Sequence, residues 1–143
     1  MEYIGPKVYI DLNHLENNYN LLSKGLHNIP IMATVKANAY GHGAVEVSKT
    51  FERLGVRYLA VFTIEEGIEL RKAGVKTDIF IYSKLNHTAL SEAKKYNLTL
   101  NISSFEDLNH LKDFQDGLLK IHLKIDTGMT RLGVSHKKAE EFL

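Results

Sequence analysis

The chain has no cysteine, only two prolines and almost no net charge, and each shortage excludes a class of protein. Without cysteine it can form neither a disulfide nor a thiolate zinc site, it has no cysteine nucleophile, and it suits a reducing compartment. With 18 basic and 17 acidic residues, its formal net charge is +1, so no excess of positive charge directs it toward nucleic acid or anionic lipid. Pro6 and Pro30 both precede the first predicted βα unit, so no proline-rich linker divides the 143 residues.

Long apolar segments and clustered metal ligands are also lacking. The longest apolar run, residues 58–64, is interrupted by Thr63 and is far shorter than the roughly 20 residues that cross a bilayer. Residues 1–6 show no basic patch leading into an apolar stretch, so they do not resemble an export signal. The seven histidines are scattered, which predicts no metal site. We therefore expect a soluble, cytoplasmic protein that binds neither nucleic acid nor membrane.

What the chain does have is a regular alternation of short apolar runs with amphipathic segments. A helix capped by Asp11, with Leu15, Tyr19, Leu22 and Leu26 on its apolar face, precedes the first run. The predicted strands are residues 31–35, 58–62, 78–82, 98–102 and 118–125. Helical spacing follows each strand, which is typical of consecutive parallel βαβ units.

Local signals mark where these helices begin and end. Thr63 with Glu66, and Ser103 with Glu106, have the spacing of a capping box. Gly55 and Gly74 lie where two of the helices are predicted to end. A last helix is predicted to start after residue 135.

Two α/β architectures accept five such units. One is an open, five-stranded doubly wound sheet, which needs about this length; the other is the first five units of a TIM-type parallel (β/α) barrel, which typically needs about 250 residues. Periodicity does not choose between them. In both, the loops after the strands open on one face, so residues 36–43 and 126–131 should both open onto it, and a ligand is expected there.

Lys36 is the first candidate for chemistry, because it directly follows the first predicted strand. A lysine at a strand end can be a partly desolvated amine, as a Schiff-base nucleophile requires, or simply a solvated charge. The residues after it, ANAYGHG (37–43), combine small residues with a phenol and an imidazole. For His42 we favour packing within the turn over catalysis.

The segment VKANAYGHG (residues 35–43) resembles, residue for residue, the pyridoxal-phosphate lysine signature of the alanine racemase family. Three further segments resemble that family's opening strand, second barrel helix and fifth barrel strand with its loop: VYIDL (8–12), EGIELRKAG (66–74) and KIDTGMTRLG (124–133). The similarity runs in register over essentially the whole chain. It implies a fragment of a (β/α) barrel.

The resemblance also implies roles for matching residues. Lys36 would hold pyridoxal 5'-phosphate as an internal aldimine and then act as the base on one face of the substrate Cα. Tyr40 would donate to the cofactor phosphate, and Arg131 would lie beside the cofactor ring oxygen and the substrate carboxylate. Lys124 matches a position that is carbamylated in some members. Unmodified, Lys124 would repel Arg131 and would face solvent or pair with a carboxylate.

The implied activity is the interconversion of L-alanine and D-alanine, which supplies D-alanine for cell-wall peptidoglycan, in a homodimer. Nothing in this chain matches the opposite-face base of the family, a tyrosine from the C-terminal domain of the partner subunit. Residues 1–143 would therefore be a single, partial N-terminal barrel domain that lacks the C-terminal β domain. We expect this chain alone to be inactive as a racemase.

Three other interpretations stay open at this point. The chain could belong to a racemase of another amino acid such as serine, or be a non-catalytic fragment that binds pyridoxal phosphate or a partner. Asp126-Thr127-Gly128 is also the triplet of an aspartic protease, which needs two such carboxylates facing each other. Those proteases are all-β, however, whereas this chain alternates strands with helices.

Overall fold

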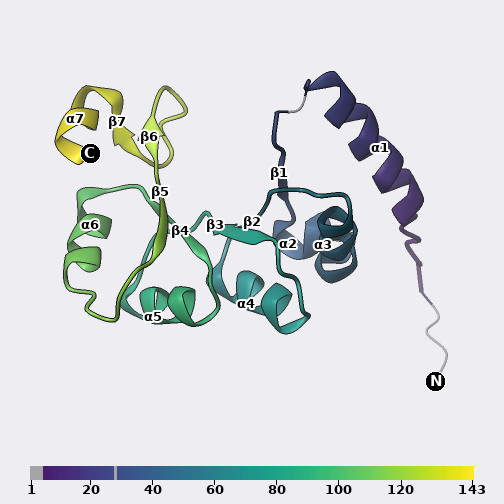
Figure 1. Cartoon of the computed structure of the whole chain (residues 1–143), viewed down its shortest axis with the longest axis horizontal. Helices are drawn as coiled ribbons and strands as arrows, with labels where there is room; N and C mark the ends of the chain where they lie inside the picture. The colour runs from purple at the N-terminus through teal and green to yellow at the C-terminus, as the bar shows by residue number, and fades with distance from the viewer. Residues whose placement is uncertain (1–4, 28) are drawn as a thin grey trace.

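The five predicted strands form one parallel sheet in the computed structural model, which describes residues 5–27 and 29–143. The strands are β1 (Met32–Thr34), β2 (Tyr58–Val61), β3 (Asp78–Ile81), β4 (Thr99–Ile102) and β5 (Lys120–Leu123). Each strand pairs with the next one along the chain, in the order β1-β2-β3-β4-β5 (Figure 1). Residues 1–4, part of the start considered for an export signal, lie outside the described residues.

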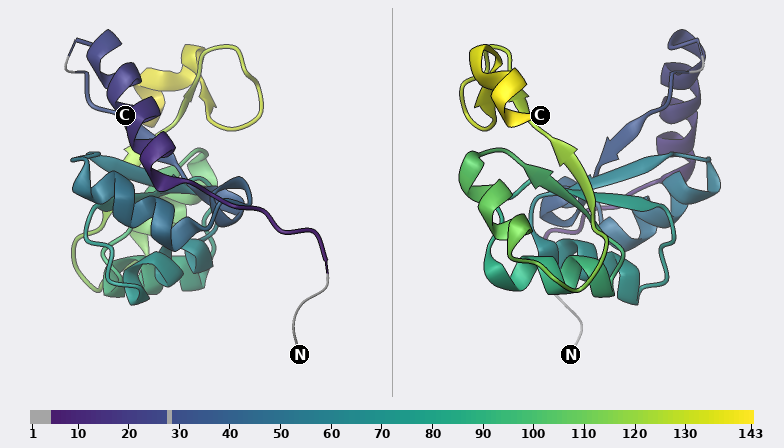
Figure 2. Two further views of the ribbon diagram at one scale, coloured as in Figure 1. Left: turned by 90° about the vertical axis from the view of Figure 1, so that its right-hand side faces the viewer. Right: turned by 60° about the vertical axis from the view of Figure 1, so that its left-hand side comes forward.

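The helices that connect the strands lie along one face of this sheet (Figures 1 and 2). They are α3 (Ala44–Arg53), α4 (Ile64–Lys72), α5 (His87–Lys95) and α6 (Phe105–Lys112), and α1 (Leu12–Gly25) precedes β1. A doubly wound sheet reverses its strand order and carries helices on both faces. The sequential order and the single helical layer are those of a TIM barrel, so the barrel prediction is confirmed and the doubly wound alternative is wrong.

The core lies between the sheet and these helices. Strand residues that face the helices, such as Leu59, Ile79, Leu100 and Ile102, are at most 1% exposed. Burying a side chain of this kind contributes roughly 1.5–3 kcal/mol. The predicted apolar face of α1 is packed only at its start: Leu15 and Tyr19 contact the core, whereas Leu22 and Leu26 are exposed.

Most of the predicted helix boundaries are confirmed. The Asp11 carboxylate accepts a hydrogen bond from the Asn13 N–H (2.8 Å), and Thr63 with Glu66 forms the predicted capping box. Gly55 and Gly74 follow α3 and α4 with φ of +78° and +90°, a backbone conformation that glycine adopts at low cost.

The predicted capping box of Ser103 and Glu106 is wrong by one residue. The hydroxyl of Ser104 accepts from the Asp107 N–H (3.1 Å), while the buried Asp107 carboxylate accepts from the N–H of Ser103 (2.8 Å). Asp107 also accepts from the Ser103 hydroxyl, so this serine belongs to the end of β4 rather than to the helix cap.

The sheet face opposite the helices carries aromatic and charged side chains. The His122 ring stacks on Phe80, with the ring centroids 5.0 Å apart, and lies 5.5 Å from the Tyr58 ring. Nearer the amino ends of the strands, Lys120 Nζ lies 2.8 Å from an Asp78 carboxylate oxygen. In a barrel this face lines the interior.

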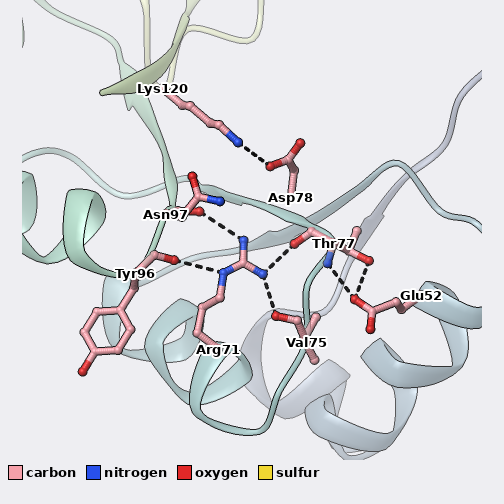
Figure 3. A network of polar contacts seen from close by, with 8 residues as sticks. All are labelled: Glu52, Arg71, Val75, Thr77, Asp78, Tyr96, Asn97 and Lys120. Atoms are coloured by element: carbon pink, nitrogen blue, oxygen red, sulfur yellow. Dashed lines mark hydrogen bonds and ion pairs between the residues drawn. The ribbon is translucent and has the colours of Figure 1, made fainter. Parts of the chain in front are cut away.

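Arg71 ties together the amino ends of β3 and β4 (Figure 3). Its guanidinium donates to four main-chain carbonyl oxygens, at Val75, Thr77, Tyr96 and Asn97, over distances of 2.7–3.1 Å. Partial burial of this guanidinium lowers the pKa of Arg71. The network lies at the end of the sheet away from the candidate functional residues.

Glu52 supports the same turn before β3. Its carboxylate accepts from the N–H groups of Lys76 and Thr77, at 2.6 Å each, and from the Thr77 hydroxyl at 2.9 Å. Burial by itself raises the pKa of Glu52, but these hydrogen bonds outweigh it and hold the pKa below its usual value.

The predicted strand 118–125 is in fact two strands. β5 ends at Leu123, and β6 (Ile125–Asp126) pairs instead with β7 (Val134–Ser135) in a separate two-stranded sheet. Gly133 allows β7 to approach β6 this closely, because a side-chain Cβ at residue 133 would lie only 2.9 Å from the backbone nitrogen of Asp126. The helix predicted after residue 135 is present as a 3-10 turn (His136–Lys138) followed by α7 (Ala139–Phe142).

Candidate functional site

Lys36 begins a left-handed helical turn at the carboxyl end of β1. This turn, α2 (Lys36–Tyr40), has positive φ values of 51° to 55° at its four non-glycine residues 37–40. A left-handed conformation costs about 1–2 kcal/mol for each of Ala37, Ala39 and Tyr40 and less for Asn38, so the turn stores about 3–6 kcal/mol. Strain of this size persists only where the surroundings hold it, and it is concentrated at functional sites.

Several hydrogen bonds hold the second half of the turn. The Asn38 side-chain oxygen accepts from the N–H of Ala44 at the start of α3 (2.8 Å). His42 Nδ1 lies 2.9 Å from the Ala39 carbonyl oxygen and 3.2 Å from that of Tyr40. These contacts match the turn-packing role favoured for His42.

A cavity of about 490 Å³ brings together three of the four predicted site residues. Its lining consists of Thr34, Lys36, Tyr40, Phe62, Tyr82, Arg131 and Leu132. The Lys36 side chain is half-buried, and its Nζ lies 5.7 Å from the centroid of the Phe62 ring. Lys36, Tyr40 and Arg131, from segments nearly 100 residues apart, thus share one site.

Lys124 lies in an adjoining, smaller cavity of about 200 Å³, which shares Tyr82, Arg131 and Leu132 with the first. Its side chain is exposed, and its Nζ donates to the carbonyl oxygen of Ile125 (3.2 Å). Within residues 5–27 and 29–143 it forms no ion pair with a carboxylate. In the structure Lys124 is thus an exposed amine. Together with main-chain hydrogen bonds, its charge lowers the pKa of Asp126, two residues further along the chain.

The charge of the two cavities has one sign. Lys36, Lys124 and Arg131 line them, and none of the described lining residues is acidic. A concave surface lined by cations attracts anions, and a guanidinium binds carboxylate or phosphate through two parallel hydrogen bonds. The site is therefore suited to a ligand that carries phosphate or carboxylate groups.

Asp126 organises the loop that carries Arg131. One of its carboxylate oxygens accepts from the N–H groups of Thr130 (2.9 Å) and Gly128 (3.0 Å), and these bonds lower the pKa of Asp126. An aspartic protease needs a pair of facing carboxylates that share a proton. Here the fold is α/β and the carboxylate is engaged within its own loop, so the protease alternative is not supported.

The left-handed turn also borders a second cavity, on its other side. His42 lines a different cavity of about 430 Å³, between α1 and the far side of the left-handed turn. In the described part of the chain, no three potential metal ligands lie close enough together to hold an ion. Among the helices of the same residues, none combines the length and apolar character needed to span a bilayer.

Sequence reasoning did not identify Phe62 and Tyr82, which line the cavity, or the contact that Glu66 makes with the turn beside it. Phe62 and Tyr82 follow β2 and β3 directly, and the rule that ligands bind at the carboxyl ends of parallel strands could have identified both. Glu66 was assigned only to a helix cap, yet one of its carboxylate oxygens also accepts from the N–H of Ala37 (2.6 Å). No sequence signal connects these two positions, which lie 29 residues apart.

Comparison with known proteins identifies one family over nearly the whole chain. The family model for the N-terminal domain of alanine racemase matches residues 10–143. An amino-acid racemase from Enterococcus faecalis is 44% identical over 135 residues, covering 94% of this chain and 19% of that protein. An alanine racemase from Halothermothrix orenii is 38% identical over 138 residues, covering 94% of this chain and 36% of that protein.

Solved structures show the same fold. An alanine racemase from Clostridium difficile 630 superposes with a TM-score of 0.82 at 36% identity, over 92% of this chain and 36% of that one. An alanine racemase from Corynebacterium glutamicum gives a TM-score of 0.85 at 27% identity, over 92% and 39%. The chain thus spans well under half of the length of each of these proteins.

Proposed function

The chain belongs to the alanine racemase family, through that family's N-terminal domain, and on this premise we propose that its Lys36 site binds pyridoxal 5'-phosphate and serves the racemisation of alanine. The observation that carries the proposal is the placement of Lys36. Its amine enters a cavity lined by cations, at the end of β1, where a strained turn fixes the backbone.

The residues of the cavity fit this cofactor. Lys36 supplies the primary amine that an aldehyde requires, and the exposed hydroxyl of Tyr40 is a donor for its phosphate. Arg131 offers a permanent positive charge to the ring oxygen or to the substrate carboxylate. The Phe62 ring, beside Lys36 Nζ, gives one wall of the site an apolar aromatic surface.

Each residue then has a defined task in the reaction. Pyridoxal phosphate, when bound, acts as an electron sink that makes the Cα proton of an amino acid acidic. Lys36 Nζ removes or returns that proton on one face of Cα. A general base must lie within hydrogen-bond distance of the proton that it transfers. Arg131 holds the substrate carboxylate and so fixes which face is presented to Lys36. Inversion needs a second acid–base group on the opposite face.

We also propose that Lys124 is carbamylated. In the structure its exposed amine and the Arg131 guanidinium line the same small cavity as two positive charges. The uncharged Lys124 amine would add to the carbon of carbon dioxide and lose one proton to water, and the resulting carbamate anion would attract and orient Arg131. A protein that keeps the free amine would still bind the substrate carboxylate, with Arg131 less well ordered.

The wider role follows from the family and belongs to the same proposal. The whole protein would be a cytoplasmic homodimer that supplies D-alanine for peptidoglycan. The opposite-face tyrosine of the family has no counterpart in this sequence, so residues 1–143 alone should exchange the Cα proton without inverting the centre.

A second candidate function is racemisation of a different amino acid, such as serine. It is favoured by one observation, that the 44% identical protein from Enterococcus faecalis is named an amino-acid racemase rather than an alanine racemase. A non-catalytic role in binding pyridoxal phosphate or a partner is the remaining alternative. It predicts cofactor uptake without proton exchange, or no uptake.

Proton exchange at Cα in deuterated water separates these functions. With cofactor present, the chain should introduce deuterium into one enantiomer of alanine faster than into serine, with little inversion, as followed by NMR. Lys36→Ala should reduce the exchange to that of the cofactor alone, whereas Lys84→Ala, which removes an exposed lysine after β3 outside both cavities, should not. Equal exchange by the wild type and Lys36→Ala would overturn the proposal.

A further inference from the structure

The Glu66 carboxylate accepts three main-chain hydrogen bonds, from two separate strand ends. One oxygen accepts from the N–H of Ala37 (2.6 Å), directly after Lys36. The other accepts from the N–H groups of Phe62 (2.7 Å) and Thr63 (3.1 Å), directly after β2. A capping box requires only the last of these bonds. The other two connect the helix cap of α4 to the candidate site.

Both of those bonds hold the surroundings of Lys36. Ala37 continues the backbone that positions the lysine, and Phe62 carries the ring that lies 5.7 Å from Lys36 Nζ. β1 and β2 are parallel neighbours, so a carboxylate between their carboxyl ends fixes the lysine backbone relative to the aromatic wall. Glu66 itself does not line the cavity, so it acts through these neighbours.

The left-handed turn depends on this contact at its first residue. Asn38 and His42 hold the second half of the turn through their side chains, as described above. At the start of the turn, the Ala37 N–H has Glu66 as its acceptor. Four consecutive non-glycine residues with positive φ require such support at both ends, because the conformation is intrinsically unfavourable.

We propose that Glu66 is a positioning residue for Lys36, which sets the lysine's direction by tying the start of the left-handed turn to the end of β2. The inference rests on the proposed function, in which Lys36 binds the cofactor. It predicts that weakening the Glu66–Ala37 bond misdirects the Lys36 amine even when α4 stays folded and capped.

Glu66→Gln separates the two tasks of this carboxylate. The amide oxygen can accept from only one side, and the side of Phe62 and Thr63 offers two donors. The amide nitrogen would then face the Ala37 N–H, donor against donor. Glu65→Gln is the matched control, since it removes the same charge from the same helical turn at an exposed side chain.

Amide hydrogen exchange measured without cofactor tests the contact, and cofactor uptake tests its consequence. In Glu66→Gln we expect exchange at Ala37 to rise at least about tenfold while Thr63 is unchanged, as for loss of one hydrogen bond to a charged group. Affinity for pyridoxal phosphate should fall about tenfold. Trinitrobenzenesulfonate should label Lys36 faster, because its half-buried amine would become more accessible beside the Phe62 ring. Glu65→Gln should leave all of these measurements at their wild-type values.

The outcomes distinguish this proposal from the one on which it rests. Faster exchange at Ala37 with unchanged cofactor affinity and unchanged Lys36 labelling would make Glu66 a helix cap only and would overturn the positioning role. Unchanged exchange at Ala37 in Glu66→Gln would overturn it as well. Should the wild-type chain fail to take up pyridoxal phosphate, the proposed function would be refuted, and exchange at Ala37 with labelling of Lys36 would still decide the role of Glu66. Glu66→Ala would remove all three hydrogen bonds, including the one that caps α4, so Glu66→Gln is the variant that decides between these outcomes.

Discussion

Replacing Arg71 with methionine isolates the hydrogen bonds that join the amino ends of β3 and β4. Methionine retains the apolar stem of the side chain but donates to none of the four carbonyl oxygens that the guanidinium contacts. Three of these bonds, to Tyr96, Val75 and Thr77, are partly shielded from water, and the fourth, to Asn97, is exposed.

The expected loss follows from that division. A hydrogen bond to a charged group contributes about 1.5–3 kcal/mol, and in a half-exposed network about 1 kcal/mol each is appropriate for the shielded three, with nothing for the exposed one. Arg71→Met should therefore lower the free energy of unfolding by about 3 kcal/mol, which corresponds to a fall in Tm of about 6–12 °C for a domain of this size.

Urea and thermal unfolding followed by circular dichroism would measure this change. Lys72→Met is the control, because Lys72 is also a cation in the last turn of α4 but is exposed. It should change the free energy of unfolding by less than about 0.5 kcal/mol. Equal losses in the two variants would show that charge at the helix end, rather than the carbonyl contacts, stabilises this region, and the reasoning would be refuted.

Gly133→Ala should displace the loop that carries Arg131, because its Cβ would lie 2.9 Å from the backbone nitrogen of Asp126. Titration of the cofactor-loaded protein with alanine should then show weaker binding, and unchanged affinity would contradict this. Hydrogen bonds lower the pKa of Glu52, so its stabilisation is complete above the unfolded value of about 4.3 and is lost as pH falls through the folded pKa. The difference in urea midpoint between the wild type and Glu52→Gln should therefore shrink below about pH 4.3, and a constant difference would refute this. Intact-mass measurement near neutral pH should show one added carbon dioxide that Lys124→Ala abolishes, and its absence from the folded protein would refute carbamylation.

Much of the local structure could be predicted from the sequence, because the signals that specify it are local. The caps at Asp11 and Thr63 and the glycine stops at 55 and 74 depend on residues within one or two turns, and all are confirmed. The first four strands were also predicted, with errors of one residue at their ends, whereas the predicted strand 118–125 is divided between β5 and β6. The one wrong cap, at Ser103, arose where two adjacent serines both fitted the pattern.

Features that depend on distant parts of the chain could not be predicted in this way. Strand order, which decides between a barrel and a doubly wound sheet, is set by how helices pack on the whole sheet. Of the alanine, asparagine and tyrosine residues in the left-handed turn, only asparagine adopts that conformation readily. The turn is held by contacts such as that from Glu66, 29 residues away from Ala37. The pairing of β6 with β7 likewise depends on a close approach at Gly133.

The central claim, that Lys36 is the cofactor-binding lysine, is tested most directly by locating the cofactor on the chain. The protein is incubated with pyridoxal phosphate, reduced with borohydride, digested, and mapped by mass spectrometry. The account predicts that the label lies on the peptide containing Lys36 at stoichiometric level, and that Lys36→Ala removes it. Label spread over the exposed lysines, or concentrated on Lys124 or another lysine with Lys36 unmodified, would contradict it.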